Sequence, residues 1–142
     1  MADTIKLEIV TPERLLVQAD AEEVVIPGES GYLGVLPGHA PLITEMAVGE
    51  IAYRAGGEVK RLAVAWGFAE VLPDKVTILA EMAEKAEEID VVRAREQKKH
   101  AEEELRKAGP GGNADAQALL DRANARLAVA EKLNAQLSNL TP

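Results

Sequence analysis

Hydrophobic and polar residues alternate from the start of the chain. Ile5, Leu7 and Ile9 are separated by single charged residues, which is typical of a strand with one buried face. Short apolar runs follow at 15–18 and 22–26, and a proline-glycine pair ends the second run. This pattern predicts a series of short strands.

Two further pairs of apolar runs flank turn residues. The runs at 51–55 and 58–65 are separated by two glycines, which accept the positive φ angles that tight hairpin turns require. The runs at 68–72 and 76–80 are separated by a Pro-Asp turn. Short strands at this spacing predict an antiparallel β-sandwich or barrel.

The composition changes after Met82. All four aromatic residues precede this position, and alanine-rich sequence with few β-branched residues follows it, which favours helix over strand. Asp90 is a suitable N-cap for a helix that extends to about residue 107. The glycine- and proline-rich segment 109–112 then ends that helix.

A second helix is predicted after this break. Asn113 or Asp115 can cap it, and it extends to about residue 137. Its apolar residues recur every three or four positions as one stripe: Ala116, Leu120, Ala123, Leu127, Ala130, Leu133 and Leu137. The first helix has a thinner stripe, made of Ala94, Ala101, Leu105 and Ala108. Two helices joined by a tight turn are expected to pack antiparallel.

The predicted fold class is therefore α+β, with an N-terminal antiparallel β-sandwich over residues 1–84 and a C-terminal antiparallel two-helix hairpin over residues 85–142. A buried leucine stabilises a fold by roughly 1.5–3 kcal/mol, whereas alanine contributes far less. An alanine seam thus holds the hairpin closed only weakly. The sequence allows two interpretations, a hairpin able to change partners or a static two-helix appendage.

Charge and composition exclude several classes of protein. The net charge is −8, and residues 1–82 hold 6 basic against 13 acidic side chains, which argues against binding nucleic acid or anionic lipid. The chain has no cysteine and two histidines, so no metal site is expected. Neither a signal peptide nor a spanning helix is evident, and a soluble, intracellular chain is the expectation.

A search for catalytic groups gives none. The sequence contains neither a phosphate-binding P-loop nor a GxGxxG pattern, and its serines lack a nearby histidine and aspartate arrangement. The carboxylates at 22–23 and 102–104 are typical of solvated faces. We therefore expect a protein that acts by binding partners.

One segment has an unusual composition for a strand or helix. Residues 31–44 contain three glycines and two prolines among apolar residues, which predicts a long, irregular but ordered connection. Its leucines and isoleucine are expected to be buried against something. His39 within it is interpreted as a hydrogen-bonded structural residue, and the segment as part of an interface.

The stretch VVIPGESGYLGVLPGHAPLIT, residues 24–44, resembles the signature of the epsilon subunit of F-type ATP synthases. The similarity continues through residues 48–51, 64–71 and 76–79. The order of a strand-rich half and a helical pair also agrees, so that the resemblance covers essentially the whole chain.

The resemblance implies a non-catalytic subunit of the central stalk of the rotor. In this family the sandwich binds the gamma subunit and the ring of c subunits, and it couples ion flow to ATP synthesis. The hairpin lies on the sandwich or extends along gamma toward the alpha and beta subunits, where it restrains ATP hydrolysis. The implied location is the cytoplasmic face of a bacterial membrane, without a membrane span. The interface residues expected here are Leu33, Val35, Leu36, Pro37, His39, Pro41 and Leu42.

The resemblance also implies a regulatory ATP site, although no cofactor is required. Some bacterial members bind ATP through Ile/Leu-Asp-x-x-Arg-Ala at the start of the first helix, and the match here is Ile89, Asp90, Arg93 and Ala94. The second helix offers Arg122 and Arg126 at i, i+4 for phosphate, and Asp90 or Glu84 can accept a hydrogen bond from the adenine amino group.

The match has one departure and leaves alternatives open. Known ATP-binding members have a further arginine about where Lys98, Lys99 and His100 stand here, and lysine cannot reproduce its bidentate geometry. Asp90 is alternatively only an N-cap, and the two arginines of the second helix alternatively face solvent or acidic beta-subunit segments. A stand-alone nucleotide-sensing module and a small enzyme are the competing functional classes.

Overall fold

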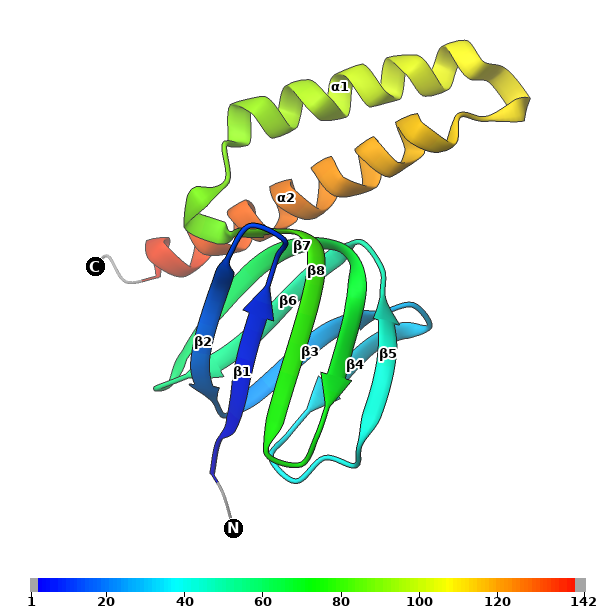
Figure 1. Ribbon diagram of the computed structural model, residues 1–142. Coiled ribbons are helices and arrows are strands. Elements are labelled where there is room, and N and C mark those ends of the chain that lie inside the picture. The colour runs from blue at the N-terminus through cyan, green and yellow to red at the C-terminus, as the bar shows by residue number, and fades with distance from the viewer. Residues whose placement is uncertain (1–2, 140–142) are drawn as a thin grey trace.

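A β-sandwich carries a helical hairpin across one of its ends in the computed structural model, which describes residues 3–139 (Figure 1). In this part of the chain the strands are β1 (Ile5–Val10), β2 (Leu15–Ala21), β3 (Glu23–Gly28), β4 (Gly31–Val35), β5 (Leu42–Met46), β6 (Gly49–Ala55), β7 (Glu58–Val71) and β8 (Lys75–Lys85). The predicted α+β class is confirmed, and both predicted hairpins form, β6 with β7 and β7 with β8.

The longest strand joins the two layers of the sandwich. The hydrogen-bonded order is β2-β1-β8-β7-β5-β3-β4, and β6 pairs with both β3 and β7. The first part of β7, residues 58–64, pairs with β6, whereas residues 67–71 pair with β5. The predicted runs at 58–65 and 68–72 are therefore one strand rather than two.

The change of partner occurs at Trp66 and Gly67. Trp66 has a φ of 56° and Gly67 a φ of 128°, in the left-handed region that non-glycine residues rarely adopt. A Cβ on Gly67 would lie 1.9 Å from the carbonyl oxygen of Leu79 on the neighbouring strand. Only glycine allows β7 and β8 to approach this closely.

One strand pair departs from the predicted antiparallel arrangement, because β1 and β8 run parallel. These strands lie at opposite ends of the sandwich sequence, so no tight turn forces them to be antiparallel. Sequence periodicity predicts that both strands exist and which face is buried, but it says nothing about the direction of a partner so distant in sequence.

Alternating residues of the strands fill the space between the layers. The fully buried large side chains of the sandwich are Ile5, Leu7, Ile9, Val24, Ile26, Val35, Ile51, Leu62, Val71, Val76 and Ile78. Branched aliphatic side chains of this size supply most of the hydrophobic free energy of folding. The alternation expected for the first strand is confirmed, since Ile5, Leu7 and Ile9 are all buried.

The glycine-rich segment 31–44 is more regular than expected. Its two ends form β4 and β5, and only residues 36–41 are an irregular loop. The expectation that its leucines and isoleucine are all buried is wrong, because Leu36 is 56% and Ile43 70% exposed. These side chains lie on the outer side of the strands or in the loop, where the chain itself has nothing to cover them.

The hairpin contains α1 (Val91–Ala108) and α2 (Ala114–Ser138), joined by the short 3-10 turn η2 (Gly109–Gly111). The predicted caps are observed: the side chains of Asp90 and Asn113 accept hydrogen bonds from the backbone N–H groups of Arg93 and Ala116, each at 3.1 Å. A second 3-10 turn, η1 (Ala86–Glu88), connects the sandwich to α1.

Helix α2 lies between α1 and the sandwich (Figure 1). Against α1 the buried side chains are alanines: Ala94 and Ala101 of α1 with Ala116, Ala123 and Ala130 of α2. On the sandwich side, Val129 is fully buried and packs with Ala63 and Ala86.

The predicted stripe of α2 needs one correction and one addition. Leu137 is 52% exposed, because the C-terminal end of α2 extends past the start of α1 (Figure 1). Val129 is absent from the predicted stripe, although Leu133, which belongs to the stripe, packs in the same sandwich-side cluster.

Candidate functional site

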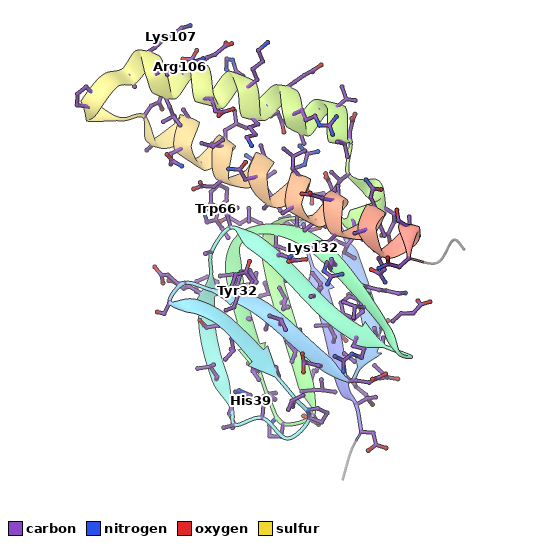
Figure 2. The ribbon with its side chains drawn as sticks, turned by 180° about the vertical axis from the view of Figure 1, so that it is seen from behind. Tyr32, His39, Trp66, Arg106, Lys107 and Lys132 are labelled. Carbon is purple, nitrogen blue, oxygen red and sulfur yellow. The ribbon has the colours of Figure 1, made fainter. Side chains whose placement is uncertain are left out.

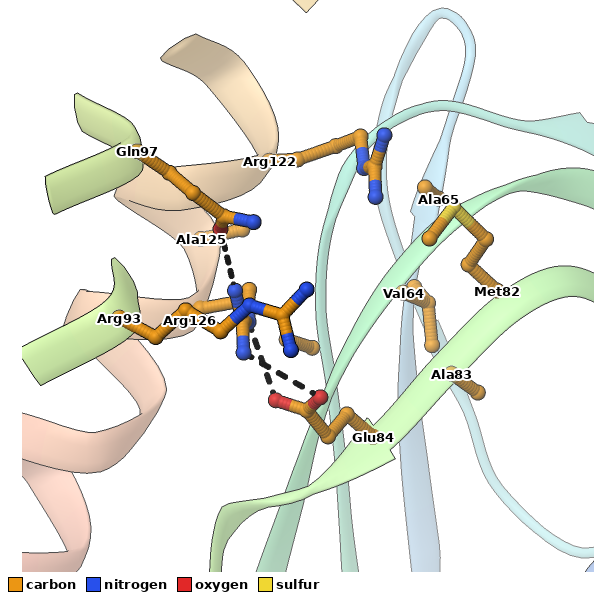
Figure 3. Close-up of a pocket in the computed structure, with 11 residues that line it drawn as sticks. Val64, Ala65, Met82, Ala83, Glu84, Arg93, Gln97, Arg122, Ala125 and Arg126 are labelled. Atoms are coloured by element: carbon orange, nitrogen blue, oxygen red, sulfur yellow. Dashed lines mark hydrogen bonds and ion pairs between the residues drawn. The ribbon is translucent and has the colours of Figure 1, made fainter. Parts of the chain in front are cut away.

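A cavity of about 230 Å³ lies where the hairpin meets the end of the sandwich (Figure 3). Both helices and strands β7 and β8 contribute to its wall. The lining residues are Ala63, Val64, Ala65, Met82, Ala83, Glu84, Arg93, Gln97, Arg122, Ala125 and Arg126. The sheet side is apolar except for one carboxylate, and the helix side carries three guanidinium groups.

Arg126 of α2 connects three of the four elements around this cavity, since it bonds to α1 and to β8. Its guanidinium donates to both carboxylate oxygens of Glu84, from Nε to Oε1 at 3.0 Å and from Nη2 to Oε2 at 3.4 Å. Its Nη1 donates to Oε1 of Gln97 on α1. Only 16% of the Arg126 side chain is exposed. This ion pair links the hairpin to β8. The planar guanidinium group matches the geometry of the carboxylate, so that two parallel hydrogen bonds form.

The other two arginines have no carboxylate partner within 4.0 Å among residues 3–139. Arg93 extends from α1 toward the sheet and Arg122 from α2 (Figure 3). The Arg122 guanidinium carbon lies 6.0 Å from the ring centre of Trp66, at the limit of a cation–π contact. With one carboxylate and three arginines, the cavity has a formal charge of +2 and suits an anion with several oxygens.

Four of the seven residues expected to bind ATP line this cavity: Glu84, Arg93, Arg122 and Arg126. The other three do not. Asp90 caps α1, Ala94 is buried in the helical hairpin, and Ile89 packs beside Val129 against the sandwich. None of Lys98, Lys99 and His100 lines the cavity either.

Sequence reasoning missed the neutral part of the wall. Gln97 lies four residues after Arg93, one turn along α1, and this spacing was the available signal. Met82 and the alanines of β7 and β8 carry no distinctive pattern. They reach the cavity because the paired strands bring Ala65 opposite Met82 and Ala63 opposite Glu84.

The residues expected at a subunit interface lie at the other end of the sandwich, where Figure 2 shows His39. Leu36, Pro41 and Leu42 are exposed, and Leu33, Pro37 and His39 are half-buried, whereas Val35 is fully buried in the sandwich core. The loop is ordered by backbone bonds, from Gly38 to the Pro73 carbonyl at 2.7 Å and from His39 to the Leu36 carbonyl at 3.1 Å. The ring nitrogen Nδ1 of His39 lies 2.7 Å from the carbonyl oxygen of Ala40, as expected for a structural histidine.

An exposed apolar row crosses the outer face of the sandwich. Val10 is opposite both Leu15 and Leu79, and Leu79 is opposite Phe68, so that four neighbouring strands each contribute one side chain. Leu15, Phe68 and Leu79 are each at least 50% exposed. The sequence did not indicate this row, because it depends on the register between strands that are distant in the chain. Continuous exposed apolar rows of this kind are typical of surfaces that bind other proteins.

Two carboxylates, Glu29 and Glu45, lie together in a groove near Trp66. A hydrogen bond with Glu45 raises the pKa of Glu29, and the negative charge of Glu45 and a small loss of hydration act in the same direction. Within the described part of the chain no group of three or more potential ligand residues is arranged to hold a metal ion. None of the helices in residues 3–139 is long and apolar enough to cross a membrane.

Comparison with known proteins gives consistent matches along the chain. The family model described as the β-sandwich domain of the ATP synthase delta/epsilon chain matches residues 4–86. The model described as the long α-helix domain of the same chain matches residues 87–131.

Individual relatives are similar over most of their length. The ATP synthase epsilon chain of Koribacter versatilis is 66% identical over 78% of this chain and 78% of its own. The epsilon chain of Syntrophobacter fumaroxidans is 50% identical over 93% of this chain and 99% of its own. A chain in the structure of the Euglena gracilis mitochondrial ATP synthase superposes with a TM-score of 0.75 over 96% of this chain and 83% of its own, at 23% identity, and shows the same fold.

Proposed function

The chain belongs to the family of ATP synthase epsilon chains, and on that premise we propose that it acts as a non-catalytic central-stalk subunit whose hairpin senses ATP. In this function the sandwich couples ion translocation to ATP synthesis by binding the gamma subunit and the c ring. The hairpin restrains ATP hydrolysis when it leaves the sandwich and contacts the alpha and beta subunits. Its place is on the cytoplasmic face of the bacterial membrane, as a peripheral part of the complex.

Two surfaces of the sandwich support this assignment of partners. The loop with exposed Leu36, Pro41 and Leu42 lies at the end opposite the hairpin, and we assign it to the c ring. The apolar row that contains Phe68 and Leu79 lies on the outer face, and we assign it to gamma. Both surfaces are apolar and uncovered in the isolated chain, as expected for an interface that is filled in a permanent complex.

The observation that carries the ATP proposal is the convergence of Arg93, Arg122 and Arg126 with Glu84 on one cavity. Guanidinium groups bind phosphate oxygens through charge-assisted hydrogen bonds, and here they come from both helices. A nucleotide bound between them links α1, α2 and β8, and so favours the docked hairpin. Ligand at 100 times its dissociation constant adds about 2.7 kcal/mol to the state that binds it, which is enough to decide the position of a weakly held hairpin.

Calorimetric titration of ATP into the isolated chain tests this proposal. We expect binding by the wild type, and at least a tenfold loss of affinity in Arg93→Ala, because a charged hydrogen bond contributes about 1.5–3 kcal/mol. Arg95→Ala is the matched control, since Arg95 is exposed on the same helix and does not line the cavity. Absence of binding at millimolar ATP, or equal losses in the two variants, would contradict the ATP site and leave the central-stalk assignment unaffected.

A further inference from the structure

A second polar cluster joins the hairpin to the sandwich, separate from the arginine cavity. Glu50 of β6 lies at its centre, with its side chain only 15% exposed. Its Oε1 is 2.8 Å from Nε of Arg61 on β7, and its Oε2 accepts a hydrogen bond from Nζ of Lys132 on α2 at 2.6 Å. Figure 2 shows Lys132 where α2 meets the sheet. None of these three residues lines the arginine cavity.

Two further hydrogen bonds lie beside this carboxylate. The backbone N–H of Glu50 donates to the hydroxyl oxygen of Tyr32 at 3.2 Å. On α2, one turn beyond Lys132, the side-chain amide of Gln136 donates to the carbonyl oxygen of Val59 at 3.2 Å. The carboxylate itself pairs with Arg61 of the sandwich, and α2 reaches the cluster through Lys132 and through Gln136, whose Oε1 accepts a hydrogen bond from Nη1 of Arg61 at 3.5 Å.

The two ion pairs of Glu50 differ in what they connect. Arg61 and Glu50 both belong to the sandwich, and their side chains are 26% and 15% exposed. Lys132 belongs to the hairpin and its side chain is 51% exposed. When the hairpin leaves the sandwich, Glu50 therefore keeps Arg61 as a partner, and Lys132 becomes hydrated. Of the two ion pairs of Glu50, the one that breaks is the exposed one, so its contribution to the cost of opening is small and depends on salt.

From this arrangement we propose that Glu50 and Lys132 form an ionic lock that sets how often the hairpin leaves the sandwich, independently of nucleotide. The inference rests on the proposed mobility of the hairpin, but not on the ATP site. The apolar contact beside the lock is small: the buried residues are Val129, Ala63 and Ala86, with partly buried Ile89, Ala125 and Leu133 packed against them. The Glu50–Lys132 pair therefore adds to the Arg126–Glu84 pair and the Gln136–Val59 hydrogen bond in holding α2 on the sandwich. Salt or an anionic surface that attracts Lys132 opens the lock.

The opening can be measured by the rate at which a buried thiol reacts, because the chain has no cysteine of its own. Val129→Cys places a thiol at a fully buried position between α2 and the sandwich, and Val24→Cys places one in the sandwich core. With a thiol reagent and no nucleotide, the first reports hairpin opening and the second reports unfolding of the sandwich.

We expect Lys132→Gln to raise the reaction rate of the Val129→Cys reporter about two- to fivefold, which corresponds to an exposed ion pair, and to leave the Val24→Cys reporter unchanged. Lys107→Gln is the matched control, because it removes the same charge at the far tip of the hairpin (Figure 2), where the ion-pair partner of Lys107 within residues 3–139 is Glu104 of the same helix. Raising the ionic strength from about 0.05 M to about 0.5 M should speed the wild-type reporter more than the Lys132→Gln reporter.

Glu50→Gln should raise the rate at least as much as Lys132→Gln, and the double variant should add little to either single change. Equal rates in Lys132→Gln and Lys107→Gln would overturn the lock while hairpin mobility stands. A Val129→Cys reporter that never reacts faster than the Val24→Cys reporter would overturn both. Neither result bears on ATP binding, which the Arg93→Ala titration decides.

Discussion

The sandwich and the hairpin are held together by different means. The sandwich buries eleven large aliphatic side chains between its layers, and six of its eight strands, all but β2 and β4, pair with at least two neighbours. The hairpin buries alanines between its helices, and it attaches to the sandwich through Val129 with partly buried Leu133, through hydrogen bonds of Gln136, through the mostly buried Arg126–Glu84 pair and through the exposed Lys132. Each large side chain contributes roughly 1.5–3 kcal/mol and an exposed ion pair at most about 1 kcal/mol. The sandwich is thus a stable platform, and the hairpin is a weakly attached element with strong helix propensity.

The largest expected effect comes from the sandwich core. Ile78→Ala should lower the free energy of unfolding by about 2–5 kcal/mol, because Ile78 is fully buried and its loss leaves a cavity. Urea denaturation followed by the fluorescence of Trp66 measures it.

Leu79→Ala is the matched control on the same strand, because Leu79 points outward and is 54% exposed. It should cost less than about 1 kcal/mol. Comparable losses in the two variants would mean that the stability of the sandwich does not come from its aliphatic core.

The hairpin should respond much less to removal of its core atoms. Ala123→Gly removes one buried methyl group from the seam and weakens the helix, so it should reduce the stability of α2 by roughly 2 kcal/mol. Ala128→Gly, at an exposed position of the same helix, should cost only about 1 kcal/mol, the difference in helix propensity.

Hydrogen exchange of the α2 backbone amides measures both changes. The amides of β1 and β8 should be unaffected, since the hairpin opens without the sandwich. If exchange in the sandwich accelerates together with exchange in α2, the two parts unfold as one unit and the comparison fails.

Much of the sandwich could be predicted because the sequence patterns that indicate its strands and turns involve residues close together in the chain. The alternation at Ile5, Leu7 and Ile9 and the glycine and proline turns depend on neighbouring residues, and the structure confirms them. The parallel pairing of β1 with β8 and the apolar row through Phe68 and Leu79 depend on contacts between distant strands. No local pattern encodes these contacts, so they became visible only in the structure.

In the candidate site, too, the residues with a local sequence pattern could be predicted and those that depend on distant contacts could not. Arg93, Arg122 and Arg126 stand out in the sequence because they lie at helical spacing beside a family motif, and all three line the cavity. Gln97 and Glu50 do not stand out, since they act through partners on other elements: Gln97 through Arg126, and Glu50 through Arg61 and Lys132.

The smallest expected effect concerns the pH dependence of the sandwich. Burial raises the pKa of the Tyr53 phenol, and the negative charge of Glu87 in η1 raises it further. The unfolded chain has a tyrosine pKa near 10, so above about pH 10 the unfolded state loses this proton first. The contribution of neutral Tyr53 is therefore complete below pH 10 and is lost as the pH rises through the folded pKa.

Urea denaturation of wild type and Tyr53→Phe between about pH 8 and pH 11 isolates this contribution, because other groups that titrate there are common to both proteins. The slope from one group cannot exceed about 1.4 kcal/mol per pH unit, and we expect a difference below about 1 kcal/mol that appears only above pH 10. Tyr32→Phe retains Tyr53 and should keep the wild-type slope. A parallel decline in wild type and Tyr53→Phe would show that ionisation of Tyr53 is not resisted by its site. The alkaline loss would then belong to groups outside the core, and the contrast between a rigid sandwich and a loosely held hairpin would rest on packing alone.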